Sequence, residues 1–142
     1  MKIAYPVRIH KEEGVYMVHG LKPLDNVLTY GKSIEKALLN AREALTGVLG
    51  VMLDDGQKIP LPPRVKRAKG LYWVEPAPSV AIPILVRRAR EEAGLTLAEL
   101  AGKLEVSYQA VQKWERSGTN PTVATLDRVL QALGRKLELE VA

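Results

Sequence analysis

A short polar segment in the second half of the chain carries side chains that are suited to reading nucleic acid. Residues 107–116 read SYQAVQKWER, and Gln109, Gln112 and Lys113 lie off the apolar side of a helical pattern. Glutamine can pair with the edge of adenine, lysine can reach guanine, and the major groove of DNA admits a helix. This segment is therefore predicted to be a DNA-reading helix.

Local signals predict neighbouring helices that would position this segment. Thr96 and Glu99 form a capping-box pattern ahead of an apolar run at helical spacing. Ser107 can cap the reading helix, residues 117–121 interrupt the pattern, and a further helix ends at Gly134. Periodicity alone leaves a second interpretation open, in which the helices form a plain bundle and the polar side chains contact only water.

The residue pattern of this region resembles the Cro/C1 (XRE-like) helix-turn-helix family. The matching pattern is G-L-T-x-x-x-L-A-x-x-L-x-V-S at 94–107, V-x-x-W-E at 111–115 and N-P at 120–121. The resemblance implies contacts with bases or neighbouring phosphates from Ser107, Tyr108, Gln109, Gln112 and Lys113. It also implies phosphate contacts near Thr119 and Asn120. Finally, it implies a partly buried structural ion pair between Arg90 and Glu115.

The first half of the chain is predicted to form a small sheet covered by one helix. Extended segments are expected at residues 1–10, 15–18, 27–30 and 57–60. Pro6 favours an edge position or a bulge for the first of them. Ser33 can cap an amphipathic helix that runs to about Leu49. Strands followed by one covering helix are typical of an α+β layer architecture.

This half resembles the HicB antitoxin domain, a shortened ribonuclease-H-like fold. The matching residues are Tyr5-Pro6, Tyr16-x-Val18, Thr29-x-Gly31, the helix from Ser33 to Ala44, and Ile59-Pro60-x-Pro62. Members of that family bind and inactivate a small RNA-cleaving toxin, HicA, and many carry a C-terminal DNA-binding domain that represses their own operon. The resemblance implies a toxin-binding surface on residues 1–63 and leaves its residues unspecified.

A basic, proline-rich segment at residues 64–80 is predicted to link a partner-binding domain, residues 1–63, to a helix-turn-helix domain, residues 81–142. Residues 63–80 carry four basic groups and one acidic group, so they hold most of the net charge of +5. The basic residues are Arg64, Lys66, Arg67 and Lys69. Either they touch DNA as a basic arm does, or the segment is a solvated connector.

The last residues of the chain are predicted to form a C-terminal strand. Leu137, Leu139 and Val141 alternate with charged residues. Such a strand needs a partner, either residues 71–74 or the same strand of a second subunit. The second choice gives a homodimer or a higher homo-oligomer.

Residues that an enzyme would need do not gather in this sequence. The aspartates of the first half, Asp25, Asp54 and Asp55, lie in turn contexts, whereas metal-dependent phosphoryl chemistry needs converging carboxylates. His10 and His19 have no neighbouring cysteine or aspartate, and cysteine is absent from the chain. We therefore predict no catalytic residue, no metal site and no cofactor, and a protein that is not an enzyme.

Composition favours a cytoplasmic protein with aliphatic cores and no membrane partner. Hydrophobic residues make up 46% of the chain and aromatic residues 5%, with no phenylalanine. No stretch approaches the roughly 20 apolar residues that span a bilayer, and residues 1–10 lack the apolar run of a signal peptide.

Two functional hypotheses follow. In the first, the chain is the antitoxin of a type II toxin–antitoxin pair, which binds and neutralises a HicA-like mRNA-cleaving toxin and represses its own operon by binding operator DNA. In the second, it is a free-standing helix-turn-helix transcriptional regulator whose N-terminal domain senses another partner or only oligomerises. The gene beside it separates them, because a short basic reading frame with a catalytic histidine would support the first.

Overall fold

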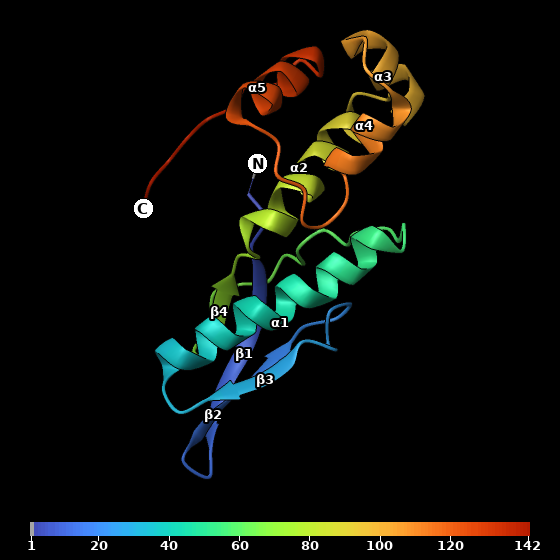
Figure 1. Ribbon diagram of the computed structural model, residues 1–142. Coiled ribbons are helices and arrows are strands. Elements are labelled where there is room, and N and C mark those ends of the chain that lie inside the picture. The colour runs from blue at the N-terminus through green and yellow to red at the C-terminus, as the bar shows by residue number, and fades with distance from the viewer. Residues whose placement is uncertain (1) are drawn as a thin grey trace.

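A four-stranded antiparallel sheet and a long helix form the first half of the protein, and four shorter helices form the second (Figure 1). The computed structural model describes residues 2–142. The first half contains β1 (Tyr5–Glu12), β2 (Val15–Gly20), β3 (Leu28–Gly31), α1 (Ile34–Asp54) and β4 (Leu71–Val74). The second contains α2 (Pro78–Glu92), α3 (Leu97–Leu104), α4 (Tyr108–Trp114) and α5 (Val123–Ala132). The predicted fold class, a small α+β sheet followed by a helix-turn-helix unit, is confirmed.

Helix α1 covers one face of the sheet, whose strand order is β3-β2-β1-β4. Alternate residues of β1, Tyr5, Val7 and Ile9, are buried in the same core as the apolar side of α1. The helix begins as predicted, because the Ser33 side chain accepts a hydrogen bond from the Lys36 amide at 3.0 Å. It continues past the predicted end to Asp54.

The edges of the sheet differ from the prediction. Strand β1 is central, which excludes the edge position, the first of the two arrangements predicted from Pro6. The proline is tolerated because it precedes the first β1–β2 pair, Val7 with Gly20, and has a strand neighbour only in β4. Residues 57–60 form no strand. The fourth strand is instead β4, which lies inside the segment predicted to be a linker.

Helix α2 contributes to two separate cores. Val80 and Ile84, one turn apart, are buried with α1 and the sheet. Val86 and Ala89 lie on the opposite side of the helix and are buried with the helix-turn-helix residues. Both halves therefore pack against the same helix, one on each face.

The ends of the remaining helices follow the local signals in the sequence. Thr96 and Glu99 form the predicted capping box, and Ser107 accepts a hydrogen bond from the Ala110 amide at 3.1 Å. Thr122 caps α5 in the same way. Gly134 follows α5 with φ +71°, a conformation that favours glycine. None of the helices in residues 2–142 is long and apolar enough to cross a membrane.

The predicted C-terminal strand is absent: residues 135–142 have no regular secondary structure. One of the two partners predicted for it, residues 71–74, is β4, which pairs with β1 and not with the tail. The side chains of Leu139 and Val141 are 77% and 97% exposed in the single chain. In the single chain the main-chain groups of this tail have no neighbouring strand to bond with, so no strand forms there.

Candidate nucleic-acid interface

The predicted DNA-reading helix is α4, and its polar side faces solvent. Val111 is fully buried and anchors the helix on the helix-turn-helix core, with Trp114 packed beside it. Four predicted contact residues are exposed and Gln112 is half-buried. The exposed four are Ser107, Tyr108, Gln109 and Lys113. Amide, hydroxyl and ammonium groups are therefore accessible on the side of α4 that would face the bases of a DNA groove.

The other two predicted contact residues lie beyond the opposite end of the helix. Thr119 is half-buried and Asn120 is exposed, both in the loop between α4 and α5. Helix α4 has seven residues, so its ends are about 10 Å apart at the usual rise per residue. The predicted base contacts thus cluster along the helix, and the predicted phosphate contacts follow its C-terminal end.

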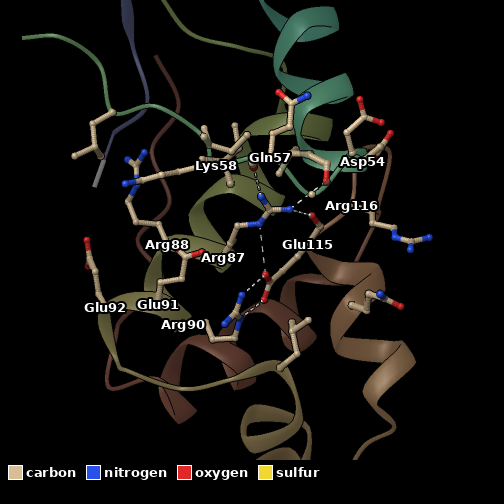
Figure 2. A pocket seen from close by; sticks show the side chains of 18 residues that line it. Asp54, Gln57, Lys58, Arg87, Arg88, Arg90, Glu91, Glu92, Glu115 and Arg116 are labelled. Carbon is tan, nitrogen blue, oxygen red and sulfur yellow. Dashed lines mark hydrogen bonds and ion pairs between the residues drawn. The ribbon is translucent and has the colours of Figure 1, made fainter. Parts of the chain in front are cut away.

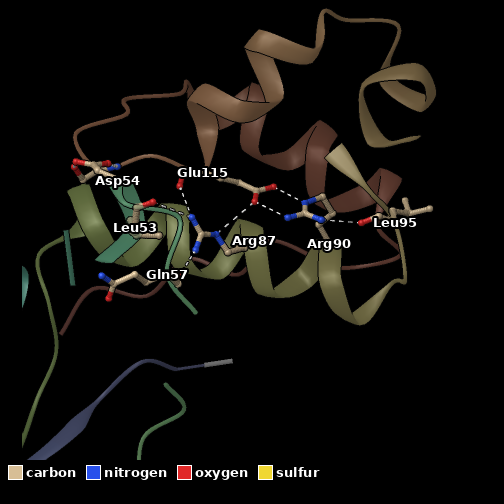
Figure 3. A network of polar contacts seen from close by, with 8 residues as sticks. Leu53, Asp54, Gln57, Arg87, Arg90, Leu95 and Glu115 are labelled. Carbon is tan, nitrogen blue, oxygen red and sulfur yellow. Dashed lines mark hydrogen bonds and ion pairs between the residues drawn. The ribbon is translucent and has the colours of Figure 1, made fainter. Parts of the chain in front are cut away.

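A buried ion pair fixes the C-terminal end of α4 (Figure 3). Arg90 of α2 donates from Nε to Glu115 Oε2 at 2.6 Å and from Nη2 to Oε1 at 2.8 Å. Arg90 Nη1 also donates to the Leu95 carbonyl at 2.8 Å. The hydrogen bond with Glu115 raises the pKa of Arg90 above its ordinary value, although partial burial acts in the opposite direction. The ion pair inferred from the sequence pattern is present.

A second arginine, Arg87, reaches the same carboxylate and was not predicted to do so. Its Nε lies 3.6 Å from Glu115 Oε1. Its Nη1 donates to the Gln57 carbonyl at 3.0 Å and its Nη2 to the Leu53 carbonyl at 3.1 Å. Cations are favoured at the C-terminal end of a helix, where carbonyls lack intrahelical partners. Arg87 therefore joins the end of α1 to the end of α4.

Directly after α4, the chain is held to α1 by a carboxylate. The Ser117 amide donates to Asp54 Oδ1 at 3.0 Å, and its hydroxyl donates to Oδ2. The hydrogen bond from the Ser117 hydroxyl, and to a smaller degree the one from its amide, lowers the pKa of Asp54 below its ordinary range. The next amide, Gly118, donates to the Ser79 carbonyl at 3.1 Å. The loop that leaves the reading helix is thus bonded to both α1 and α2.

A cleft of about 860 Å³ lies along this seam between the two halves (Figure 2). Its lining includes Lys58, Arg88 and Arg116, together with Glu91 and Glu92. Charges of both signs make it a polar cleft. Among residues 2–142, no three side chains of the histidine, aspartate and glutamate types come together as metal ligands would.

The basic residues at 64–69 do not lead into the helix-turn-helix. They belong to the exposed loop between α1 and β4, where the Arg67 guanidinium lies 5.9 Å from the centre of the Trp73 ring. The segment that joins the sheet to α2 is much shorter, residues 75–77. It is pinned to α1, because the Ala77 amide donates to Thr46 Oγ1 at 3.0 Å. The predicted linker at 64–80 is thus mostly part of the first half.

Comparison with known proteins identifies relatives over nearly the full chain. A family model described as helix-turn-helix matches residues 86–139. Antitoxin HicB 1 of Photorhabdus laumondii is 33% identical over 96% of this chain and 86% of its own length. Antitoxin HicB 2 of the same organism is 30% identical over 95% and 94%. The crystal structure of antitoxin HicB from Burkholderia pseudomallei covers 76% of this chain and 89% of its own, with 17% identity and a TM-score of 0.46.

Proposed function

Because the chain belongs to the HicB antitoxin family, we propose that it binds and neutralises a HicA-like mRNA-cleaving toxin and represses its own operon by binding operator DNA. The observation that carries the DNA-binding part is the exposed polar side of α4 on a buried apolar anchor. The toxin-binding part is supported by the family and is assigned to the surface of residues 1–63. Both are binding roles that need no catalytic group or cofactor, and both belong in the cytoplasm, where promoter and mRNA are found.

Direct readout would come from the long polar side chains of α4. Gln109 and Lys113 are exposed and one turn apart, so both can face the same groove. Ser107 and Tyr108 open the helix, where side chains and amides can meet a phosphate. Thr119 and Asn120 would bind the backbone beyond the other end of α4. Such phosphate contacts make affinity fall as salt rises.

A homodimer would present two copies of α4 to a two-fold operator. The tail offers a means of pairing, since Leu137, Leu139 and Val141 alternate with charged residues and have no partner strand in the single chain. Pairing with the same segment of a second copy would satisfy their main-chain groups. Two reading helices would then meet half-sites about 34–36 Å apart or a multiple of it.

The DNA-binding part is tested with the promoter fragment upstream of the gene. Gln109→Ala and Lys113→Ala are each expected to weaken specific binding by about 1–3 kcal/mol and to leave the unfolding curve unchanged. Gln131→Ala on α5 and Lys103→Ala on α3 are matched exposed controls and should bind as the wild type does. An unchanged footprint in both α4 variants would place the readout elsewhere.

The toxin-binding part is tested by co-expression with the neighbouring gene. A stable complex and relief of growth arrest are expected if that gene encodes the toxin. If the wild-type chain bound the promoter and formed no complex, the protein would instead be a free-standing regulator.

A further inference from the structure

The reading helix is attached at its C-terminal end to the first half of the protein. Asp54 accepts two hydrogen bonds from Ser117, and Arg87 joins the carbonyls of Leu53 and Gln57 to Glu115. These contacts are directional, unlike the apolar packing of α1 against α2. They end on the residue that closes α4 and on the second residue after it.

We propose that the first half positions the reading helix through two residues that do not themselves touch DNA. Asp54 of α1 binds Ser117 directly, and Arg87 of α2 binds the carbonyls of Leu53 and Gln57 while it lies against Glu115. The two hold residues 115–117, and so set the direction in which α4 presents its polar side. This inference rests on the proposed DNA binding. It adds that specific affinity depends on residues of the half assigned to the toxin.

The short length of α4 makes an external support necessary. Isolated helices shorter than about 12–15 residues are marginal in water, so a seven-residue helix owes its pose to tertiary contacts. Val111 anchors its apolar side. The remaining freedom is a swing of the C-terminal end, which the contacts of Glu115 and Ser117 restrain.

Glu115 is the residue that most strongly restrains the C-terminal end of α4. Its side chain is 5% exposed and lies between Arg90 and Arg87, whose side chains are 12% and 16% exposed. A swing of α4 would separate a buried carboxylate from one guanidinium or the other, and buried charges that lose partners are costly. Because Arg87 also binds the carbonyl of Leu53 in α1 and that of Gln57 just after it, the position of α4 depends on α1 as well as on its own domain.

The consequence for binding is a matter of preorganisation. A reading helix that is already posed loses little conformational freedom when it enters the groove, whereas a loosened one must be ordered at the expense of affinity. Loss of the Asp54–Ser117 contact should therefore weaken specific binding, although both residues lie beyond the predicted base contacts.

The test compares two adjacent carboxylates in the full-length protein. Asp54→Ala removes the acceptor of Ser117, and Asp55→Ala removes the same charge from the next residue, which closes α1. We expect Asp54→Ala to weaken binding to the promoter fragment by about three- to tenfold, the range for one lost hydrogen-bonded contact. Asp55→Ala should stay within about twofold of the wild type. Both variants should still unfold in one cooperative transition, so that weaker binding is not a loss of the fold.

Ser117→Ala supplies the second arm and guards against a fold defect in the first. Ser117→Ala removes the hydroxyl hydrogen bond and keeps the amide one, so its effect should lie between those of the wild type and Asp54→Ala. The double variant should lose no more than Asp54→Ala alone, because that substitution already removes both hydrogen bonds. Amide hydrogen exchange of the free protein gives a readout without DNA. Exchange at Ser117 and in α4 should be faster in Asp54→Ala and unchanged in Asp55→Ala.

The outcomes separate this inference from the proposed function. If the wild type binds the promoter and Asp54→Ala behaves as Asp55→Ala does, only the positioning role is refuted. Tighter binding by Asp54→Ala would also refute it, because the contact would then hold the helix away from DNA. If the wild type binds no promoter fragment, the proposed repression and the positioning role both fail.

Discussion

Removing the charge of Glu115 is the most informative single perturbation of this protein. Glu115 is the one charged residue among 2–142 that is buried, with 4% of its surface exposed. Its carboxylate pairs with Arg90 at 2.6 and 2.8 Å and lies 3.6 Å from Arg87. Glu115→Gln keeps the shape of the side chain and removes the negative charge. Two guanidinium groups then share a largely buried site without a counter-charge.

The expected cost follows from that burial. Breaking a buried pair by removing one partner costs about 3–5 kcal/mol, because the remaining charge is left uncompensated. For a chain of this size, such a loss lowers the unfolding temperature by about 10 °C or more. Calorimetry and urea unfolding measure the effect directly. Specific DNA binding should weaken too, because the pair closes the C-terminal end of α4.

A matched control separates burial from charge alone. Glu92 pairs with Arg135, and both side chains are more than two-fifths exposed. Glu92→Gln should therefore cost less than about 1 kcal/mol, as exposed ion pairs do. If Glu115→Gln were as mild as Glu92→Gln, the buried pair would not carry the stability assigned to it, and the reasoning would be refuted.

Three further predictions concern the first half. Burial raises the pKa of Tyr5 above its usual value near 10. The contribution of Tyr5 to the free energy of unfolding is therefore complete below about pH 10 and is lost as pH rises through the folded-state pKa. Tyr5→Phe should abolish this alkaline loss, measured by urea unfolding at a series of pH values. Leu45→Ala should cost about 2–5 kcal/mol of unfolding free energy, because Leu45 is 1% exposed, and Leu39→Ala, at 49% exposed, much less; equal losses would argue against the core as described. A Cβ at Gly31 would lie 2.3 Å from the Ala37 amide nitrogen, so Gly31→Ala should lower the melting temperature. Gly47→Ala, in open space within α1, should raise stability by about 0.5–1 kcal/mol, and the opposite order of the two glycine variants would contradict the packing of β3 on α1.

The starts of four helices could be predicted because their signals are local. Ser33, Thr96, Ser107 and Thr122 each lie just before an apolar periodic run, and each hydrogen-bonds a main-chain amide three residues later. The pair Arg90–Glu115 was reachable only through the family pattern. The spacing of two residues 25 positions apart does not by itself predict a contact.

The contacts between the halves could not be predicted from the sequence, for a physical reason. Arg87 binds main-chain carbonyls at the end of α1, and carbonyls carry no sequence signature. Asp54 and Ser117 are 63 residues apart and each lies in an ordinary polar turn context. The place of β4 was missed for a related reason: a four-residue apolar strand gives no sign of the edge on which it pairs. The C-terminal alternation suggested a strand, yet alternation supplies no partner.

The double-sided packing of α2 constrains how this protein can be taken apart. A cut between residues 80 and 81 would remove Ile84 from the core of the first half, and on the other fragment its apolar side chain would face water. Chimeras and truncations should therefore keep Pro78–Glu92 intact and replace side chains around its circumference instead. The border between the two cores runs lengthwise along a single helix, so no position along the chain divides them.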